Sequence, residues 1–153
     1  MILKTPTNNN SLVESIKLRI NTWISGSSDA KESVLAIYIY GSVLHPDKFK
    51  HYSDIDLAFL LNQSLYKQDP LLCSGPAYMV STDIGLKLDR QTDVIILNSA
   101  SIETAYQIVT TGIVIYEADR ENRLEYETAV RGLYFDFNPF LQKLRNQRCR
   151  LTA

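Results

Sequence analysis

The sequence predicts a small α/β domain of the α+β kind, in which helices flank a mixed β-sheet and a long helix ends the chain. A length of 153 residues fits a single domain, so residues 1–153 are expected to form one unit. The composition, 45% hydrophobic and 22% charged, is that of an ordinary globular protein. Apolar patterns alternate along the chain in the order helix, strand, strand, helix, strand, helix, strand, helix.

The N-terminal part of the chain predicts one amphipathic helix. Residues 1–10 are polar and are expected to be flexible. Ser11 followed by Glu14 has the pattern of a capping box and predicts that the helix covers residues 11–25, before Gly26. Its apolar residues recur at helical spacing: Leu12, Val13, Ile16, Ile20, Trp23 and Ile24.

Two strands follow this helix. Residues 34–42 are rich in β-branched and aromatic side chains, and the run ends sharply at Gly41, which predicts a buried strand. Residues 43–53 contain Pro46 and several charges and predict a loop. Residues 54–61 predict the second strand.

The middle of the chain predicts a loop and then a helix. Residues 62–75 include Pro70 and Gly75 and are interpreted as a loop. The helix is expected over residues 76–88, with Pro76 in its first turn, because proline lacks the N–H that this turn leaves unpaired.

A strand, a helix and another strand are predicted next. Residues 92–98 form the third strand, Ser101 begins the helix, Gly112 ends it, and residues 113–117 form a short strand. One face of this helix is apolar and comprises Ile102, Ala105, Tyr106 and Val109.

A long helix beginning at Asp119 is predicted to complete the domain, and Pro139 is expected to kink or end it. Its expected inward residues are Leu124, Val130, Leu133 and Tyr134. The last segment is basic, with Lys143, Arg145, Arg148 and Arg150. These cations either complement the C-terminus of the helix or contact RNA or an acidic partner, and the sequence favours neither interpretation.

Charge and hydropathy argue against several classes of protein. A net charge of −1 provides no general attraction to nucleic acid or to an anionic membrane, so no direct nucleic-acid binding is expected. No apolar stretch approaches the roughly 20 residues of a membrane span, and the N-terminus lacks the apolar core of a signal peptide. We therefore expect a cytoplasmic protein. Cys73 and Cys149 match no zinc-binding spacing and are expected to be reduced thiols.

Three aspartates are the candidate chemical groups. Asp54 and Asp56 are two residues apart on a strand, so both side chains project from the same face. Carboxylates this close repel each other unless a cation lies between them, and Mg²⁺ prefers such oxygen ligands. Asp93 begins the third strand, and if these strands are neighbours it completes a site for two metal ions roughly 3.5–4 Å apart. Taken alone, an Asp-x-Asp pair is more often a solvated turn, so the combination carries the argument.

The combined motif resembles that of a known superfamily. Gly41-Ser42, eleven intervening residues, Asp54-Ile55-Asp56 and the later Asp93 are similar to the signature of the DNA polymerase β-like nucleotidyltransferases. The nearest resemblance is to the minimal nucleotidyltransferases (MNT), in particular the MntA-type antitoxins encoded beside HEPN ribonuclease toxins. It extends over nearly the whole chain.

Two features depart from the pattern of this family. The usual gap after Gly-Ser is ten residues, and a one-residue loop insertion costs little. Many members follow Gly-Ser with Arg-Gly, where this sequence has Val43-Leu44-His45-Pro46. The group that neutralises the triphosphate is therefore undefined, and the candidates in this loop are His45, Lys48, Lys50 and His51.

The resemblance implies a small nucleotidyltransferase fold and a set of roles. Gly41 and Ser42 would contact the β- and γ-phosphates of ATP. Asp54 and Asp56 would hold two Mg²⁺ ions. Asp93 would bind one of them and help to deprotonate the acceptor hydroxyl, making all three aspartates catalytic.

The resemblance also implies an antitoxin that transfers AMP from ATP to a tyrosine of a cognate HEPN toxin, with which it would form a hetero-oligomer. Two alternatives stay open. In the first, the chain is a nucleotidyltransferase for a small molecule, with a homodimer supplying the missing wall of the site. In the second, it is a non-catalytic antitoxin that only occludes its partner.

Overall fold

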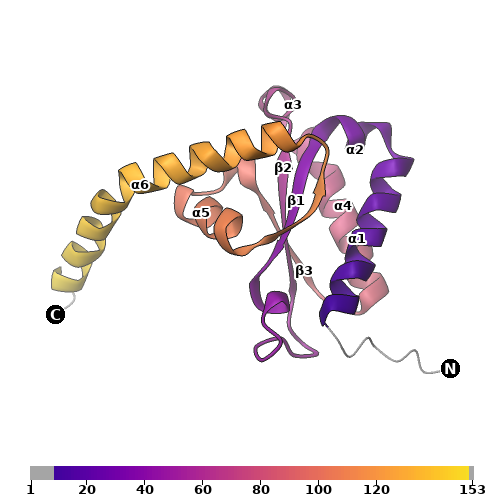
Figure 1. The fold of residues 1–153 in the computed structure, drawn as a ribbon, viewed down its shortest axis with the longest axis horizontal. Helices are drawn as coiled ribbons and strands as arrows, with labels where there is room; N and C mark the ends of the chain where they lie inside the picture. The colour runs from indigo at the N-terminus through magenta and orange to yellow at the C-terminus, as the bar shows by residue number, and fades with distance from the viewer. Residues whose placement is uncertain (1–8, 152–153) are drawn as a thin grey trace.

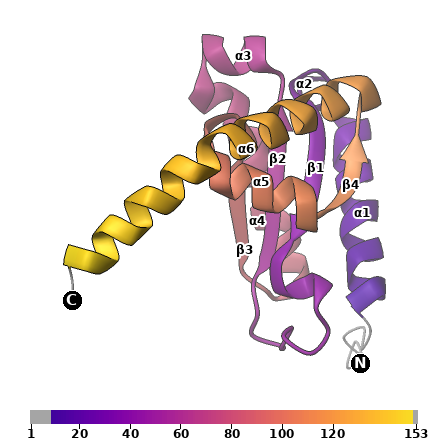
Figure 2. The same ribbon diagram turned by 60° about the vertical axis from the view of Figure 1, so that its left-hand side comes forward.

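A mixed four-stranded sheet with helices on both faces forms the centre of the molecule (Figures 1 and 2). The structure is a computed structural model that describes residues 9–151. The strands are β1 (Val34–Tyr40), β2 (Ile55–Leu61), β3 (Thr92–Ile96) and β4 (Ile113–Glu117), in the spatial order β3-β2-β1-β4. β1 runs antiparallel to β2 and β4, and β2 runs parallel to β3. The predicted fold class is therefore confirmed.

One face of the sheet is covered by α1 (Asn9–Gly26), α2 (Ser28–Ser33) and α4 (Pro70–Leu88). Successive residues of a strand point to opposite faces, and the odd-numbered residues of β1 from Ile37 onward and of β2 point to this one. The core on this side includes Ile16, Ile20, Ile37, Leu57, Phe59 and Ile84, each fully buried.

The opposite face is covered by α5 (Ile102–Thr111) and α6 (Arg120–Leu151). Its core includes Ala36, Tyr38, Ala58, Leu60, Ile108 and Val130. These two helices cover only one end of the sheet, and the end of β1 and the start of β2 extend beyond them (Figure 2). This leaves an open part of the sheet on the α5–α6 face.

Helix α1 begins two residues earlier than predicted. Because Asn9 and Asn10 are already helical, Ser11 lies inside the helix and the predicted Ser11–Glu14 capping box is wrong. Asn9 Nδ2 donates a hydrogen bond of 3.1 Å to Val43 O and so ties this end of the helix to the segment after β1. Of the predicted flexible stretch, residues 1–8 lie outside the described residues.

The segment predicted as a loop, residues 62–75, contains helix α3 (Gln63–Gln68) and the beginning of α4. Asn62 Oδ1 accepts hydrogen bonds from the first backbone N–H groups of α3, and Asp69 Oδ1 accepts one from Leu72 N at the start of α4. Proline does occupy the first turn of α4, but it is Pro70, and Pro76 lies inside the helix. The correct signals were the two capping side chains.

Two predicted strand ends are corrected by short 3-10 turns. Gly41 and Ser42 belong to η1 (Gly41–Leu44) and not to β1. The third strand ends at Ile96, because residues 97–99 form η2 (Leu97–Ser99). Helix α5 agrees with its prediction, since Ser101 caps its start and Gly112 its end.

Helix α6 is continuous through Pro139, so the proline does not end it, but the ribbon bends in its second half (Figure 1). Asp119 Oδ1 accepts hydrogen bonds from Glu121 N and Asn122 N, which confirms the predicted start. Val130 is buried and Tyr134 half-buried, as expected. Leu124 and Leu133, predicted to point inward, are 42% and 49% exposed. The packed face instead follows the spacing 126, 130 and 134, and both leucines lie off it.

Within residues 9–151 no helix is both long and apolar enough to cross a membrane.

Candidate active site

Gly41 makes the turn at which β1 ends. Its φ of +81° is in the left-handed region, which L residues with a side chain rarely adopt. A Cβ atom at this position would also overlap Asp56 Oδ2 on the neighbouring strand. Backbone and packing therefore both require glycine here, and the backbone of Gly41 lies directly against the carboxylate of Asp56. The half-buried Ser42 follows in the same turn.

The three predicted carboxylates lie at one end of the sheet, where β2 and β3 begin. Asp56 pairs with Tyr40 across the antiparallel ladder and with Asp93 across the parallel one. Asp54 comes immediately before β2, two residues from Asp56, and so lies on the same face. This is the α5–α6 face, because the even-numbered residues Tyr38, Ala58 and Leu60 of β1 and β2 pack there. The structure thus brings Asp54, Asp56, Asp93 and the Gly41–Ser42 turn together.

The charges of this cluster are uncompensated. Burial, followed by repulsion from Asp93 and then Asp54, raises the pKa of Asp56 to about 6. Burial and the charges of Asp56 and Asp93 raise the pKa of Tyr40 to about 12. Within the described chain no lysine, arginine or histidine forms an ion pair with any of the three aspartates. The cluster therefore favours an added cation.

The donor set suits a hard divalent ion, since it consists of carboxylate oxygens on adjacent strands. In the part of the chain that is described, however, no three acidic, histidine or cysteine side chains are already grouped to hold a metal ion. Binding would therefore require Asp54, Asp56 and Asp93 to rotate toward one another. The raised pKa of Asp56 shows that their charges already interact.

The loop between β1 and β2 is held by an arginine that the sequence did not single out. Arg90 Nη1 donates hydrogen bonds to Lys50 O (2.9 Å) and Ser53 O (3.0 Å). Its guanidinium group also lies 4.3 Å from the centre of the Phe49 ring. Because Ser53 precedes Asp54 and Arg90 is three residues before Asp93, this residue fixes the approach to both carboxylates. No sequence motif marks it, since the contact joins segments about forty residues apart.

The candidate phosphate-binding residues of this loop are all exposed: His45, Lys48, Lys50 and His51. Lys50 Nζ donates to Asp47 O at 3.1 Å within the loop. None of the four pairs with a site carboxylate in the described chain, so each remains a candidate for the triphosphate.

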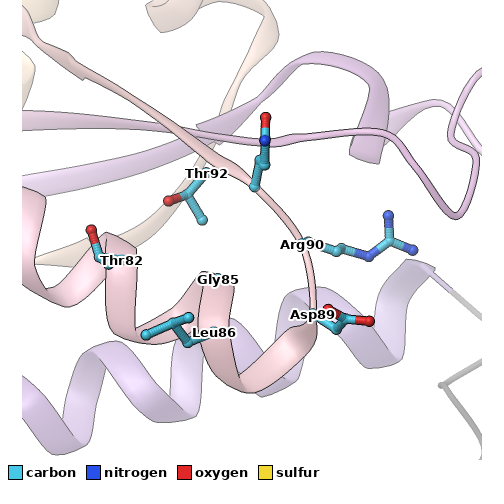
Figure 3. A pocket seen from close by; sticks show the side chains of 7 residues that line it. Thr82, Gly85, Leu86, Asp89, Arg90 and Thr92 are labelled. Atoms are coloured by element: carbon cyan, nitrogen blue, oxygen red, sulfur yellow. The ribbon is translucent and has the colours of Figure 1, made fainter.

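A separate hollow of about 440 Å³ lies behind the start of β3. Figure 3 shows it between α4 and β3, with Thr82, Gly85 and Thr92 on its walls. Thr92 points to the opposite side of the strand from Asp93. This hollow is therefore distinct from the carboxylate cluster.

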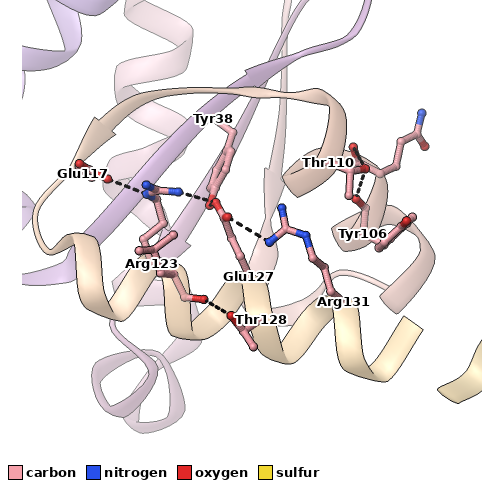
Figure 4. Close-up of polar contacts among 10 residues, drawn as sticks. Tyr38, Tyr106, Thr110, Glu117, Arg123, Glu127, Thr128 and Arg131 are labelled. Carbon is pink, nitrogen blue, oxygen red and sulfur yellow. Dashed lines mark hydrogen bonds and ion pairs between the residues drawn. The ribbon is translucent and has the colours of Figure 1, made fainter. Parts of the chain in front are cut away.

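A buried polar network attaches α6 to the sheet (Figure 4). Tyr38 Oη donates a hydrogen bond of 2.7 Å to Glu127 Oε1. Arg123 donates to Glu117 and Glu127 at 2.6 Å each, and Arg131 contacts the other oxygen of Glu127. Burial disfavours the charge of Glu127, but the hydrogen bonds from Tyr38 and Arg123 outweigh this and lower its pKa. The network fixes the helix above the covered end of the sheet.

Comparison with known proteins identifies the family. The family model described as polymerase beta, nucleotidyltransferase matches residues 24–121, which include Gly41, Ser42 and all three aspartates. No curated protein matches the sequence.

Solved structures share the fold at low sequence identity. A toxin–antitoxin structure with AMP-PNP superposes with a TM-score of 0.65 and 18% identity, over 90% of this chain and 98% of the other. An MntA–HepT toxin–antitoxin structure has a TM-score of 0.61 and 17% identity, over 92% and 99% of the two chains. A complex of a tri-AMPylated HEPN toxin from Shewanella oneidensis with an MNT antitoxin has a TM-score of 0.60 and 20% identity, over 90% and 99%.

Proposed function

Because this chain belongs to the polymerase β nucleotidyltransferase family, we propose that it is an antitoxin that transfers AMP from ATP to a tyrosine hydroxyl of a HEPN ribonuclease toxin. The observation that carries the chemical half of the proposal is the cluster of Asp54, Asp56 and Asp93 beside the Gly41–Ser42 turn, on the open part of the sheet. The partner half is supported by neighbours of the same fold, which are toxin–antitoxin complexes, one of them with an AMPylated toxin.

Each residue of the cluster has a role in this proposal. The tight turn at Gly41 lets the backbone approach the β- and γ-phosphates closely, and the Ser42 hydroxyl donates to them. Asp54 and Asp56 would hold Mg²⁺ together with Asp93, and such ions would supply positive charge for the triphosphate. Asp93 orients the acceptor hydroxyl and helps to remove its proton. The acceptor oxygen then bonds to the α-phosphorus as the bond to the leaving pyrophosphate breaks.

The raised pKa of Asp56 agrees with this assignment. A carboxyl with a pKa of about 6 is mostly charged at pH 7 but becomes protonated as the pH falls through 6, where a cation can bind only by displacing the proton. AMP transfer should therefore weaken below about pH 6, where protonation of Asp56 competes with Mg²⁺.

The decisive experiment is intact mass spectrometry of a candidate HEPN toxin, after incubation with this chain, ATP and MgCl₂. Mass increases of whole AMP units that require the ATP and are lost with the Asp54→Ala/Asp56→Ala double variant would support the proposal. A HEPN protein that is inhibited equally by both versions without a mass change would show occlusion instead. If it neither binds nor gains mass, small hydroxyl compounds become the acceptors to test.

A further inference from the structure

The surface that surrounds the carboxylate cluster contains a groove between α5 and α6. It has a volume of about 340 Å³ and is lined by Tyr106, Gln107 and Thr111 of α5 and by Tyr134 and Arg145 of α6. The rings of Tyr106 and Tyr134 are stacked in parallel, with centroids 3.7 Å apart, and form a rigid aromatic wall. None of these side chains has a role in the chemistry proposed above.

One end of this groove lies next to the candidate active site. Thr111 is followed by Gly112, at which a Cβ atom would lie 3.2 Å from Ile39 O and 3.4 Å from Tyr40 Cβ. Tyr40 pairs with Asp56 and precedes Gly41. The groove therefore runs along α5 toward the carboxylates, on the same face of the sheet.

The other end of the groove continues onto the free part of α6. Beyond Tyr134 this helix leaves the sheet and projects from the molecule in both views (Figures 1 and 2). It carries large apolar side chains in solvent, with Phe137, Phe140 and Leu144 being 50%, 58% and 44% exposed. Their spacing of three and four residues places them along one side of the helix.

We propose that the α5–α6 groove and the apolar stripe of Phe137, Phe140 and Leu144 form one docking surface for the protein that supplies the acceptor hydroxyl, and that the groove guides its acceptor segment to the carboxylates. This inference rests on the proposed function and extends it to how the partner is recognised. The apolar stripe holds the partner, and the groove leads its acceptor segment to the carboxylates.

The chemistry of the surface selects a protein and not RNA. The stripe is apolar and aromatic, as in the centre of protein–protein interfaces. Arg145 is the cation within the groove, and it is already paired with Glu103, whose carboxylate would repel a phosphate. The apolar stripe favours a partner with an apolar surface, and the basic residues at the end of α6 favour an acidic rim around it.

The test compares two exposed faces of the same molecule. Phe140→Asp/Leu144→Asp alters the stripe, and Thr111→Lys alters the groove near the carboxylates. Leu18→Asp/Leu86→Asp is the matched control, because these leucines are 68% and 78% exposed on α1 and α4, on the other face of the sheet. All variants change only exposed side chains, so their melting temperatures should match that of the wild type.

The readouts separate docking from chemistry. The stripe variant should bind the candidate HEPN toxin at least tenfold more weakly by titration calorimetry, and both docking variants should raise the KM for this toxin at least tenfold. Their kcat at saturation should change less than about twofold, and their affinity for AMP-PNP should stay that of the wild type. The control variant should behave as wild type throughout.

Unchanged binding of the docking variants, or an equal loss in the Leu18/Leu86 control, would overturn the inference. So would binding of a fluorescent single-stranded RNA that the stripe variant abolishes while HEPN binding persists. If the wild type binds the HEPN protein without transferring AMP, the proposed function fails. The calorimetric comparison then still decides where the partner docks.

Discussion

Gly41 shows how two independent constraints converge on one residue. Its positive φ and the adjacent Asp56 carboxylate each exclude a side chain. We therefore predict that Gly41→Ala lowers the free energy of unfolding by about 1–3 kcal/mol. AMP transfer should fall at least tenfold, because the turn must move away from Asp56. Urea denaturation and transfer assays measure the two effects.

The matched control is Gly132→Ala on α6, where no atom lies within 4 Å of the added Cβ and φ is not positive. There the same change should raise stability by roughly 0.5–1 kcal/mol, because alanine favours the helix. If both substitutions destabilise equally, the turn at position 41 is not the special feature that we describe.

Asp56 should stabilise the fold less when it is charged than when it is neutral. Its folded pKa of about 6 lies above the ordinary value of 3.8, so the contribution of the protonated form is complete below pH 3.8 and is lost as the pH rises through 6. Without divalent ions at pH 7.5, Asp56→Asn is therefore expected to raise the melting temperature by a few degrees, while AMP transfer falls at least a hundredfold.

Calorimetric scans in EDTA at pH 4 and pH 7.5 measure this difference. The gain should be small at pH 4, where the wild-type carboxyl is itself mostly neutral. Asp136→Asn, on the exposed part of α6, serves as the control and should leave the melting temperature unchanged at both pH values. A melting temperature that falls at pH 7.5 would show that the charged carboxylate stabilises the fold.

At the scale of elements, the buried Glu127 network fixes the position of α6. Glu127 is 6% exposed and accepts hydrogen bonds from Tyr38 and two arginines. Glu127→Gln removes the charge that these arginines compensate, and we predict a loss of roughly 2–4 kcal/mol in the free energy of unfolding. Glu125→Gln, an exposed change on the same helix, should stay within about 0.5 kcal/mol.

The pH dependence of this network has the opposite sign to that of Asp56. The folded pKa of Glu127 lies below the ordinary value of 4.5, so its contribution is present above that value and is lost as the pH falls through the folded pKa. The stability difference between wild type and Glu127→Gln should therefore shrink in acid. Urea titrations at pH 7 and pH 3 compare the two, and a difference that grows in acid would contradict the assignment.

The helices and strands also show how much of the fold the sequence could predict. The strands and α5 have strong local signals, such as β-branched runs and a Ser101 cap, and their positions agree with the structure. The predicted start of α4 was wrong because Pro70 and Gly75 suggested a loop and Pro76 suggested the first turn of the helix, although Asp69 and Pro70 already begin it. A proline inside a helix costs free energy, and here tertiary packing offsets that cost: Cys73, Ala77 and Val80 are buried.

The candidate site, too, was predicted from the sequence only in part. Strand periodicity predicted that Asp54 and Asp56 share a face, and Asp93 was expected beside them if the second and third strands are neighbours. The pairing of β2 with β3 meets this condition and places Asp93 opposite Asp56. Arg90 and the Tyr106–Tyr134 stack depend on contacts between distant segments, which one sequence does not reveal. Their roles follow only from the tertiary structure.

Viewed as a whole, the molecule places its chemistry and its free surface on one side. Helices α5 and α6 lie on one face of the sheet, and α1, α2 and α4 close the other (Figure 2). The carboxylates and the α5–α6 groove belong to the first of these faces. Under the proposed function, this arrangement would let one face bind a large acceptor while the core stays intact. Folding and partner recognition should then depend on different parts of the chain.

This separation predicts the effect of removing residues 139–153. Of the described residues from Pro139 onward, only Leu141 is even partly shielded and none is buried. The ion pair of Arg145 with Glu103 is largely exposed, so its loss should cost less than about 1 kcal/mol. The shortened chain is therefore expected to melt within a few degrees of the full chain and to bind AMP-PNP with the same affinity.

Its transfer of AMP to the HEPN protein should nevertheless fall, because Phe140 and Leu144 of the docking stripe are gone. Scanning calorimetry, nucleotide titration and intact mass spectrometry of the same preparations measure the three properties. A large drop in melting temperature would mean that the end of α6 supports the core. Unimpaired transfer with an intact core would mean that the partner docks elsewhere, so stability and transfer together assign the role of the helix.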